Sequence, residues 1–466
     1  MLETAEQRLV SLDVFRGMTI AGMVLVNNPG TWSSIYGPLK HAEWHGITPT
    51  DYIFPFFLFI VGVAIPIALS KRIEAGITRD VYYKIISRSF LIFALGIVMS
   101  AIPFFNFAET QIPWLLKVLI VLSYSAALFL YLWDKTIPAL IVAGLAAAVV
   151  SAFFFASTFI APYNVSGMRI PGVLQRIADC YLVVSLIYLH TNWKQQTVIG
   201  IGLLLLYWLL MTLVPVPGCE IATVDDKACN LAAWLDRTIL TEAHIWRSAK
   251  VFDPEGILST IPAIVTAISG VLTGTWLTSV PLAVAGDSSL TTDQLMADDE
   301  PMQASSDNVK PPATTGGSDK ALGLFFAGTV LLAIGWSWSL VFPLNKSLWT
   351  SSYVLYTSGL ALLTLAFCYY VIDIKGYKRW AKPFVIFGVN ALALFVFSGI
   401  MARLMGMIRF TGQDGKEISL QQWIFNNIYL SILSPINASL AYAIGFILFW
   451  LFLMWLLYRR RIFIKV

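Results

Sequence analysis

The sequence predicts an all-α protein that crosses a membrane many times. Of its 466 residues, 58% are hydrophobic and only 12% are charged, whereas a soluble domain carries about 25% charged residues. So little charge cannot cover a water-facing surface, which excludes an ordinary soluble enzyme. Apolar runs of helix length recur along almost the whole chain, and they are continuous rather than alternating, so helices are favoured over a barrel. The net charge of +4 is small and implies no nucleic-acid partner.

We predict about twelve membrane-spanning helices in one domain that covers residues 1–466. Most of the apolar runs are long enough to cross a hydrocarbon core of about 30 Å. The run that ends at Pro103 is short for a span. In order, the predicted spans cover residues 12–28, 51–70, 88–103, 113–132, 136–160, 171–190, 197–214, 257–279, 320–342, 350–372, 383–405 and 437–457.

Basic residues predict that both termini are cytoplasmic. The dense Lys and Arg clusters within 71–88, 375–382 and 459–465 all fall on the side that holds the N-terminus, and such residues accumulate in cytoplasmic loops. The N-terminal stretch is partly acidic, and no cleavable signal peptide is visible. We therefore interpret the first apolar run as a retained first span.

Two long loops interrupt the pattern of spans. Residues 214–256 are predicted to form a folded external loop, because they mix charges, aromatic residues and two cysteines. An oxidising compartment would allow Cys219 and Cys229 to form a disulfide, although spacing alone does not fix the geometry. Residues 280–319 are rich in Ser, Thr, Asp, Pro and Gly, which predicts a disordered cytoplasmic linker.

The segment from Asn27 to Asp51 is the most informative candidate for chemistry. It joins the first two spans on the external side and holds Glu43 and two of the four histidines, His41 and His45. Histidine suits general-base work because its usual pKa lies close to the operating pH. The alternative is an aromatic belt at the membrane surface with incidental histidines. A zinc site needs three or four convergent ligands, and this loose set does not predict one.

Ionisable and polar groups beside or inside other spans are further candidates, because they are costly in a membrane. Asp13 and Arg16 are three residues apart and can pair, or they can anchor the helix at the interface. Asn390 lies inside an apolar span, where an interhelical hydrogen bond is the alternative. Two other predicted spans, at 171–190 and 257–279, begin near charged residues. The alternative to a functional role there is that the carboxylates simply cap a helix. The polar residues at these two starts are Arg169, Arg176, Asp179, Asp253 and Glu255.

A transporter or flippase of a sugar-like or lipid-linked substrate is one functional hypothesis, because a bundle with intramembrane charges fits it. Against it, no inverted repeat is obvious, and the charges cluster at span ends. The sequence also has no Walker A loop, Rossmann fingerprint, GxSxG or CxxC motif, so ATP-driven pumping and serine hydrolysis lack support.

Several long motifs resemble the heparan-α-glucosaminide N-acetyltransferase family, and in particular its bacterial branch. They follow the same order from residue 8 to the C-terminus: SLDVFRGMTIAGMVLVNN, LKHAEWHGITPTDYIFPFFLFIVG, RSFLIFALGI, RIPGVLQR, VPVPGC, DPEGILST, NKSLWTSSYV, VIDIKG and YRRRIFIKV. The N-terminal lumenal domain of the animal members is absent, whereas the spans at 113–160 and the 280–319 linker look additional. His45 stands where the animal relatives have Asn.

The resemblance implies acetyl transfer across a membrane, here the bacterial inner membrane. Acetyl-CoA from the cytosol would be the co-substrate, and an amino sugar or another amine on the external side would be the acceptor. The catalytic histidine of the family maps onto His41 and its catalytic asparagine onto Asn27. The resemblance implies no permanently bound cofactor or metal. It leaves open whether the protein works as a homodimer.

The implied chemistry assigns a role to each candidate. His41 would act as the base or as an acyl carrier, and Asn27 would donate to the oxyanion. Asp51 or Glu43 would orient the imidazole, with His45 as a second supporting group. The CoA phosphates would stay at the cytoplasmic rim while the pantetheine arm reaches through the bundle. The predicted phosphate ligands are Arg16, Lys84 and Arg88, and the predicted acceptor-side residues are Arg176, Asp253, Glu255 and Asn390.

Overall fold

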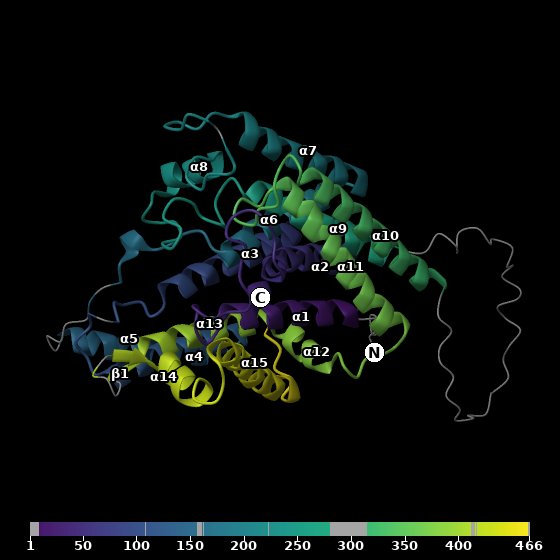
Figure 1. Ribbon diagram of the computed structural model, residues 1–466. Coiled ribbons are helices and arrows are strands. Elements are labelled where there is room, and N and C mark those ends of the chain that lie inside the picture. The colour runs from purple at the N-terminus through teal and green to yellow at the C-terminus, as the bar shows by residue number, and fades with distance from the viewer. Residues whose placement is uncertain are drawn as a thin grey trace, which may run out of the picture.

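The computed structural model confirms an all-α polytopic membrane protein (Figure 1). It describes residues 9–107, 109–155, 161, 163–221, 223–279, 315–411, 415 and 417–464. Within these ranges, ten helices are long and apolar enough to cross a membrane, or eleven if one bent pair counts as a span. The described β-structure is one short antiparallel pair, β1 (Arg409–Thr411) with β2 (Glu417–Ser419).

Fifteen α-helices follow one another along the described chain, with short 3₁₀ and π segments at some of their ends. The 3₁₀ and π segments used below are η1 (Gly37–Leu39), η2 (Pro49–Tyr52) and η6 (Tyr369–Ile374), which continues α11. The α-helices are α1 (Val10–Asn27), α2 (Ile53–Glu74), α3 (Arg79–Ala101), α4 (Trp114–Leu132), α5 (Thr136–Phe155), α6 (Val173–His190), α7 (Trp193–Leu213), α8 (Leu231–Leu240), α9 (Thr260–Thr278), α10 (Thr315–Trp338), α11 (Ser351–Cys368), α12 (Lys382–Val389), α13 (Ala391–Met407), α14 (Leu420–Ile424) and α15 (Pro435–Arg459).

Each of the twelve predicted spans coincides with a helix or a helix pair, but several boundaries differ. α3 begins at Arg79, nine residues before the predicted start at 88. Lys84 therefore lies on the same helix as Arg88 rather than before it, and both residues are exposed. α10 begins at Thr315, inside the predicted linker. Residues 280–314 of that linker lie outside the described part of the chain.

The predicted span at 383–405 is broken at Asn390. α12 and α13 meet there at an angle of 80°. Asn390 bonds the segment that follows α15, not another helix: its Nδ2 donates to the Ile462 carbonyl at 3.0 Å, and its Oδ1 accepts from the Ile464 amide at 2.9 Å. A Cβ at Gly388 would lie 2.0 Å from the Asp13 carbonyl oxygen, so α12 packs directly against the beginning of α1.

That placement separates Asn390 from the other acceptor-side candidates. It lies beside the first turns of α1, whereas Asn27 and the His41 segment follow the last turn. A helix of 18 residues is about 27 Å long. Asn390 is therefore about one helix length away from the external segment, and the prediction that it lies on the acceptor side is not supported by its position.

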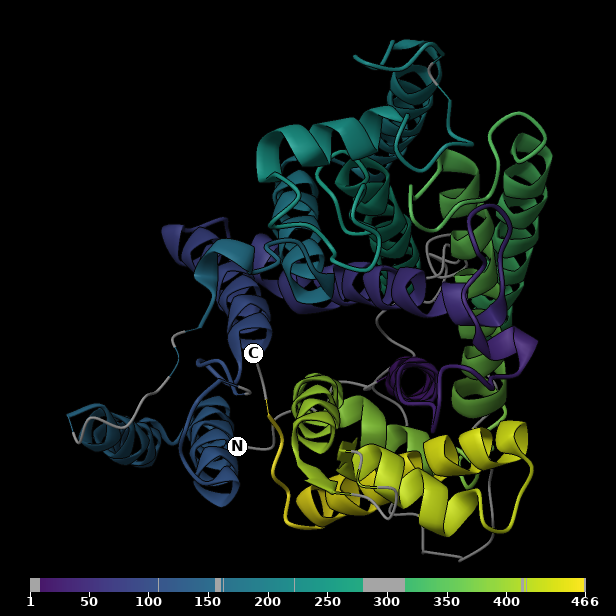
Figure 2. The same ribbon diagram turned by 60° about the vertical axis from the view of Figure 1, so that its left-hand side comes forward.

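The spans form two groups that face each other (Figure 2). One group contains α2, α3, α6, α7, α9, α10 and α11, and the other contains α1, α12, α13 and α15. The α4–α5 hairpin lies to the side and contacts α13 through α4. Within the first group, α2 and α9 touch backbone to backbone, because a Cβ at Gly62 would lie 2.0 Å from the Ala267 carbonyl oxygen. Small residues at such crossings allow close helix packing in membranes.

Candidate functional site

The segment between α1 and α2 fixes His41 against a buried carboxylate. His41 Nδ1 lies 2.6 Å from Asp51 Oδ1, and Asp51 lies in η2 with a side chain only 1% exposed. The other carboxylate oxygen accepts from the amides of Ala42 and Thr48 and from the Thr48 hydroxyl, at 3.0 to 3.2 Å. Asp51 is therefore fully engaged, and it orients the imidazole with Nδ1–H as donor. That tautomer leaves Nε2 as the basic nitrogen.

Lys346, in the loop between α10 and α11, completes this arrangement. Its Nζ lies 3.2 Å from both ring nitrogens of His41 and 4.0 Å from Asp51 Oδ1. Burial lowers the pKa of Lys346, while the negative charges of Asp51 and Glu255 oppose that shift. We refer to His41, Asp51 and Lys346 together as the His41 cluster.

Sequence reasoning missed Lys346, although a signal was present. The motif NKSLWTSSYV contributed to the family resemblance, but its lysine was given no role. A lysine in a short loop that is predicted to be external departs from the usual bias of basic residues towards the cytoplasm. That departure could have marked Lys346 as a candidate.

The other two ionisable residues of this segment do not contact His41. His45 Nε2 lies 2.8 Å from Asp225 Oδ1 in the external loop, and its Nδ1 lies 3.3 Å from Asn345 Nδ2. Residues 41–48 form no helix, so the two histidines are not stacked one turn apart. Glu43 is exposed and makes no hydrogen bond or ion pair with any described residue. Of the two carboxylates considered from the sequence, Asp51 is the one in contact with the imidazole.

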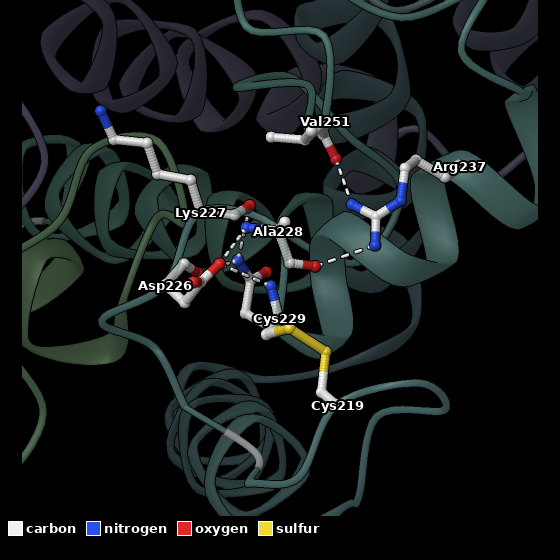
Figure 3. The surroundings of a disulfide bond; sticks show 8 residues. Cys219, Asp226, Lys227, Ala228, Cys229, Arg237 and Val251 are labelled. Carbon is white, nitrogen blue, oxygen red and sulfur yellow. Dashed lines mark hydrogen bonds between the residues drawn. A yellow bond between two sulfur atoms is a disulfide. The ribbon is translucent and has the colours of Figure 1, made fainter.

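The loop between α7 and α9, which the sequence predicts to be external, is a folded layer that covers this segment. Cys219 and Cys229 are joined by a disulfide, and the Asp226 carboxylate accepts from the Ala228 and Cys229 amides at 2.6 and 2.9 Å (Figure 3). Arg237 of α8 donates to the Ala228 and Val251 carbonyls at 2.8 and 2.5 Å.

Trp44 connects the His41 segment to this layer. Its indole Nε1 donates to the Val224 carbonyl at 2.9 Å, and its ring packs on Phe252 with 5.1 Å between centroids. Together with the contact between His45 and Asp225, these interactions hold the segment under the loop.

Asp253 and Glu255 bind an arginine instead of capping the following helix. Asp253 accepts two hydrogen bonds from Arg169, at 2.8 Å from Nε and 2.5 Å from Nη2, and Glu255 accepts from the same Nη2. Burial opposes the charge of Arg169, but both carboxylates outweigh it and hold the pKa above its ordinary value. Burial likewise opposes the charge of Glu255, yet Arg169 and Arg176 hold its pKa below the usual range.

Arg176, in the first turn of α6, is almost completely buried behind this pair. Its Nη2 donates to the Gly256 carbonyl at 3.0 Å and to Ser259 Oγ at 2.5 Å, and the guanidinium lies 5.1 Å from the Trp349 ring centroid. Its Nε and Nη1 have no hydrogen-bond partner among the described residues. Arg176 thus supports the loop that carries Asp253 and Glu255.

Asp236 of α8 lies beneath the same loop. Burial raises its pKa to about 6, although its carboxylate accepts from the Ile257 amide at 2.9 Å and from the Asp253 amide at 3.3 Å. The loop that presents Asp253 and Glu255 is therefore held on one side by arginines and on the other by this carboxyl group.

A central cavity of about 730 Å³ lies between the two groups of spans. It is lined at one end by Asp13, Arg16 and Arg88 and by Ile464 of the segment after α15. Arg16 Nη1 lies 3.5 Å from Asp13 Oδ1, and Arg88 lies over the Tyr181 ring at 5.0 Å. The structure thus brings two of the three predicted phosphate ligands to one cavity.

The other end of this cavity stops short of the His41 segment. Met23 lines it, and exposed Asn27 follows Met23 by one helical turn on the same face of α1. Neither Asn27, His41 nor Lys84 is among the lining residues. No described contact joins Asn27 to His41, so the structure does not bring the two predicted catalytic residues together directly. No group of three or more possible metal ligands is found among the described residues.

Comparisons with known proteins relate the chain to one group of membrane enzymes. A family described as a domain of unknown function (DUF5009) matches residues 8–236. The heparan-alpha-glucosaminide N-acetyltransferases of Mus musculus and Homo sapiens are 24% and 25% identical to the chain, over 99% and 100% of its length. The match covers 61% of each of these two proteins, so the chain spans less than two thirds of their length.

Proposed function

Because this chain is a distant relative of the heparan-α-glucosaminide N-acetyltransferases, we propose that it is a transmembrane acetyltransferase. It takes the acetyl group from cytosolic acetyl-CoA and transfers it to an amine, in the first instance an amino sugar, on the external side. The membrane is the inner membrane of a bacterium, with both termini in the cytoplasm.

The observation that carries the proposal is the contact of 2.6 Å between His41 and buried Asp51. An ammonium group cannot attack a thioester, so the acceptor needs a base that removes its proton. With Nδ1–H bound to Asp51, Nε2 of His41 is the nitrogen that can accept it. The C–N bond then forms, the C–S bond breaks, and the proton passes to the leaving thiolate.

Two donors can stabilise the oxyanion, and one of them, Lys346, lies beside this base. The Asn27 amide is exposed at the end of α1, and the Lys346 amine lies 3.2 Å from the imidazole. A positioned donor of this kind contributes about 3 to 4 kcal/mol in other acyl-transfer enzymes. Lys346 also adds positive charge beside Asp51, which keeps the carboxylate ionised.

The central cavity suits the pantetheine arm of acetyl-CoA. Arg16 and Arg88 line one end of it and can bind the CoA phosphates as charge-assisted donors. The α1 helix rises by about 16 Å between Arg16 and Asn27, which is on the scale of an extended pantetheine arm. The remaining lining is mostly aliphatic and aromatic, as expected for a path that excludes water.

Acetyl transfer from radiolabelled acetyl-CoA to glucosamine, with purified protein in nanodiscs, tests the proposal. His41→Ala should abolish transfer while acetyl-CoA still raises the melting temperature of the protein. His190→Ala, at the far end of α6, is the matched control and should retain wild-type activity. Full activity in His41→Ala would refute the assignment of His41.

The same preparation distinguishes a base from an acyl carrier. If His41 carries the acetyl group, acetyl-CoA alone should release one CoA per protein before any acceptor is added, and His41→Ala should release none. If His41 acts only as a base, no CoA is released until glucosamine is present. Two separate steps would also give ping-pong kinetics.

A transporter is the second candidate, and the broken span at Asn390 favours it. Discontinuous helices line substrate sites in many secondary transporters. Here the break binds the segment after α15 through Asn390. Uptake of labelled glucosamine into liposomes without acetylation, unchanged by His41→Ala, would favour this alternative over the enzyme.

A further inference from the structure

His45 joins two loops that are far apart in the sequence. Its Nε2 lies 2.8 Å from Asp225 Oδ1, in the disulfide-bonded layer, and its Nδ1 lies 3.3 Å from Asn345 Nδ2, in the loop between α10 and α11. We call this second loop, residues 339–350, the Lys346 loop. One imidazole therefore lies between the disulfide-bonded layer and the loop that carries a member of the His41 cluster.

The hydrogen bonds of the two neighbours determine which nitrogen of His45 carries the proton. Asn345 Oδ1 accepts from the Leu348 amide at 2.9 Å, so Asn345 Nδ2 is the donor that faces His45. Nδ1 of His45 therefore accepts, which leaves the proton on Nε2, where it is donated to the Asp225 carboxylate. His41 has the opposite tautomer, with its proton on Nδ1. The two histidines thus accept hydrogen bonds on different ring nitrogens.

The Asn345 amide depends on His45 for its hydrogen bond. Asn345 is 0% exposed, and His45 Nδ1 is the one acceptor that its Nδ2 has among the described residues. A buried donor that loses its acceptor is costly, because water cannot replace the missing partner. Loss of the His45 acceptor would therefore leave an unsatisfied donor inside the Lys346 loop.

The turn that carries Lys346 is held together by its own hydrogen bonds. The Asn345 amide donates to Thr350 Oγ1 at 3.0 Å, and the Thr350 amide donates to the Asn345 carbonyl at 3.2 Å. Inside this pair, the Trp349 amide donates to the Lys346 carbonyl at 3.1 Å. Because these bonds close the turn on itself, it should move as one unit, and Lys346 should move with it.

Two hydrogen bonds join this turn to the His41 segment in the described chain, apart from the contacts of Lys346 itself. One is the bond between Asn345 and His45, and the other runs from the Gly46 amide to the Leu344 carbonyl at 2.8 Å. Removal of the first bond leaves only the backbone bond at Gly46. The position of Lys346 beside the imidazole therefore depends on His45.

The loop that the disulfide closes, residues 219–229, holds the other side of His45. We call it the disulfide loop. Thr223 Oγ1 accepts from the Asp225 amide at 3.1 Å and donates to Asp225 Oδ2 at 3.3 Å, which orients the carboxylate. The Asp225 side chain is 74% exposed, so its contact with His45 adds little stability by itself. Its effect is on the tautomer, because it favours the proton on Nε2.

We propose that His45 is a positioning residue for Lys346, and that the disulfide loop sets the tautomer that this role requires. The Asp225 carboxylate keeps the proton of His45 on Nε2, Nδ1 accepts from Asn345, and the docked turn holds the Lys346 amine beside His41. The effect of this arrangement on acetyl transfer rests on the proposed function, whereas the position of Lys346 does not.

Two amide substitutions separate the two nitrogens of His45. The side-chain oxygen of asparagine lies near the place of Nδ1 and can accept from Asn345, whereas glutamine reaches the place of Nε2 and keeps the contact with Asp225. His45→Asn should therefore retain the docked turn, and His45→Gln should release it. His190→Gln is the matched control, because His190 is exposed at the end of α6, where it bonds Tyr82.

The rate at which N-hydroxysulfosuccinimidyl acetate labels Lys346 reports its position without any transfer. The full chain in nanodiscs is labelled in the absence of acetyl-CoA, and mass spectrometry compares Lys346 with Lys250, an exposed lysine outside both loops. Relative labelling should rise by at least about fivefold in His45→Gln and stay within about twofold of wild type in His45→Asn and His190→Gln. Unchanged labelling in His45→Gln, or an equal rise in His45→Asn, would overturn the proposal.

Variants of Asp225 test the control of the tautomer, and they change only an exposed side chain, so the fold should be retained. Asp225→Lys replaces the acceptor with a donor, which favours the proton of His45 on Nδ1 and opposes the bond with Asn345. Relative labelling of Lys346 should therefore rise by about twofold to fivefold. Asp225→Asn still offers an acceptor and should match wild type. Equal labelling in these two variants would overturn the role of the disulfide loop.

Transfer kinetics test whether the position of Lys346 affects the reaction. His45→Gln should lower kcat by about tenfold, and His45→Asn should restore most of it. In a Lys346→Met background, His45→Gln should lower kcat by less than about twofold, because both changes remove the same interaction. Equal losses in the two backgrounds would overturn an effect through Lys346. If the wild type transfers no acetyl group, the proposed function fails, but the labelling result still decides the position of Lys346.

Discussion

The His41 cluster and the arginine pocket, which is the cavity lined by Arg169, Arg247 and Arg403, organise their charged groups in opposite ways. In the cluster, Asp51 is saturated by four hydrogen-bond donors, and Lys346 lies against both nitrogens of His41. In the pocket, Arg247 and Arg403 are fixed only by backbone carbonyls and keep their charge.

This difference separates two tasks that a transferase has to perform. A saturated cluster holds one imidazole in one orientation, which is what proton transfer requires. An unsaturated pocket has donors left over for a ligand, which is what binding requires. Arg169 belongs to both neighbourhoods, because it lines the pocket and binds Glu255, whose charge also reaches Lys346.

Asp51→Asn should produce the largest effect of the four variants, and this effect should be limited to the His41 cluster. The variant removes the charged acceptor of His41 Nδ1–H and favours the wrong tautomer, so kcat should fall by about a thousandfold to ten-thousandfold. Glu43→Gln is the control, since Glu43 does not contact His41. Wild-type kcat in Asp51→Asn would contradict the role given to Asp51.

Arg169→Gln should affect both regions through stability. It leaves the buried carboxylates of Asp253 and Glu255 without their cation, which costs about 3 to 5 kcal/mol. We expect a lower free energy of unfolding in denaturant, together with slower transfer. Combining it with Asp253→Asn should recover part of the stability. Wild-type stability in Arg169→Gln would contradict the role given to this ion pair.

Asp236 should make the stability of the external layer depend on pH. Its pKa is raised from 3.8 to about 6, so the folded protein binds this proton more tightly than the unfolded chain does. The contribution of Asp236 to stability should therefore be greatest below pH 4, and it should fall by about 3 kcal/mol as pH rises through 6 to about 7. Melting temperatures of wild type and Asp236→Asn, compared between pH 4 and 7, measure this, because the variant should lack the dependence.

Lys346→Met should have the smallest effect of the four. It removes one donor beside His41 but leaves Asp51 in place, so the transfer rate should fall by about tenfold to a hundredfold. Because the pKa of Lys346 is lowered, the wild-type rate should decline at alkaline pH where this ammonium loses its proton, and the variant should lack that decline. An identical pH–rate profile in both proteins would contradict the catalytic role given to Lys346.

The spans could be predicted from the sequence because burial in lipid requires long apolar helices, and this requirement leaves a clear pattern. The structure differs from these predictions where charged or polar residues belong to a helix. The third span was predicted to begin at residue 88, whereas α3 begins at Arg79 and includes Lys84, whose exposed position costs little at the interface. The break at Asn390 was not predicted, because its cause is a hydrogen bond to residues more than seventy positions later.

The candidate site could be predicted only in part, because some of its contacts join residues that lie far apart in the sequence. His41 and Asp51 are ten residues apart and could be recognised together in one segment. Lys346 lies 305 positions from His41, and Arg247 and Arg403 meet only because α13 ends beside the external loop. Contacts over such separations depend on how the two groups of spans dock, which no local pattern specifies.

The segment after α15 has a consequence for the order of assembly. Phe463 and Ile464 form part of the wall of the central cavity, and Asn390 holds them there. Because these residues follow α15 in the chain, they can dock only after that span has been synthesised. Until they dock, the central cavity lacks this part of its wall. The bundle can therefore bind its co-substrate properly only after α15 and the segment that follows it are in place.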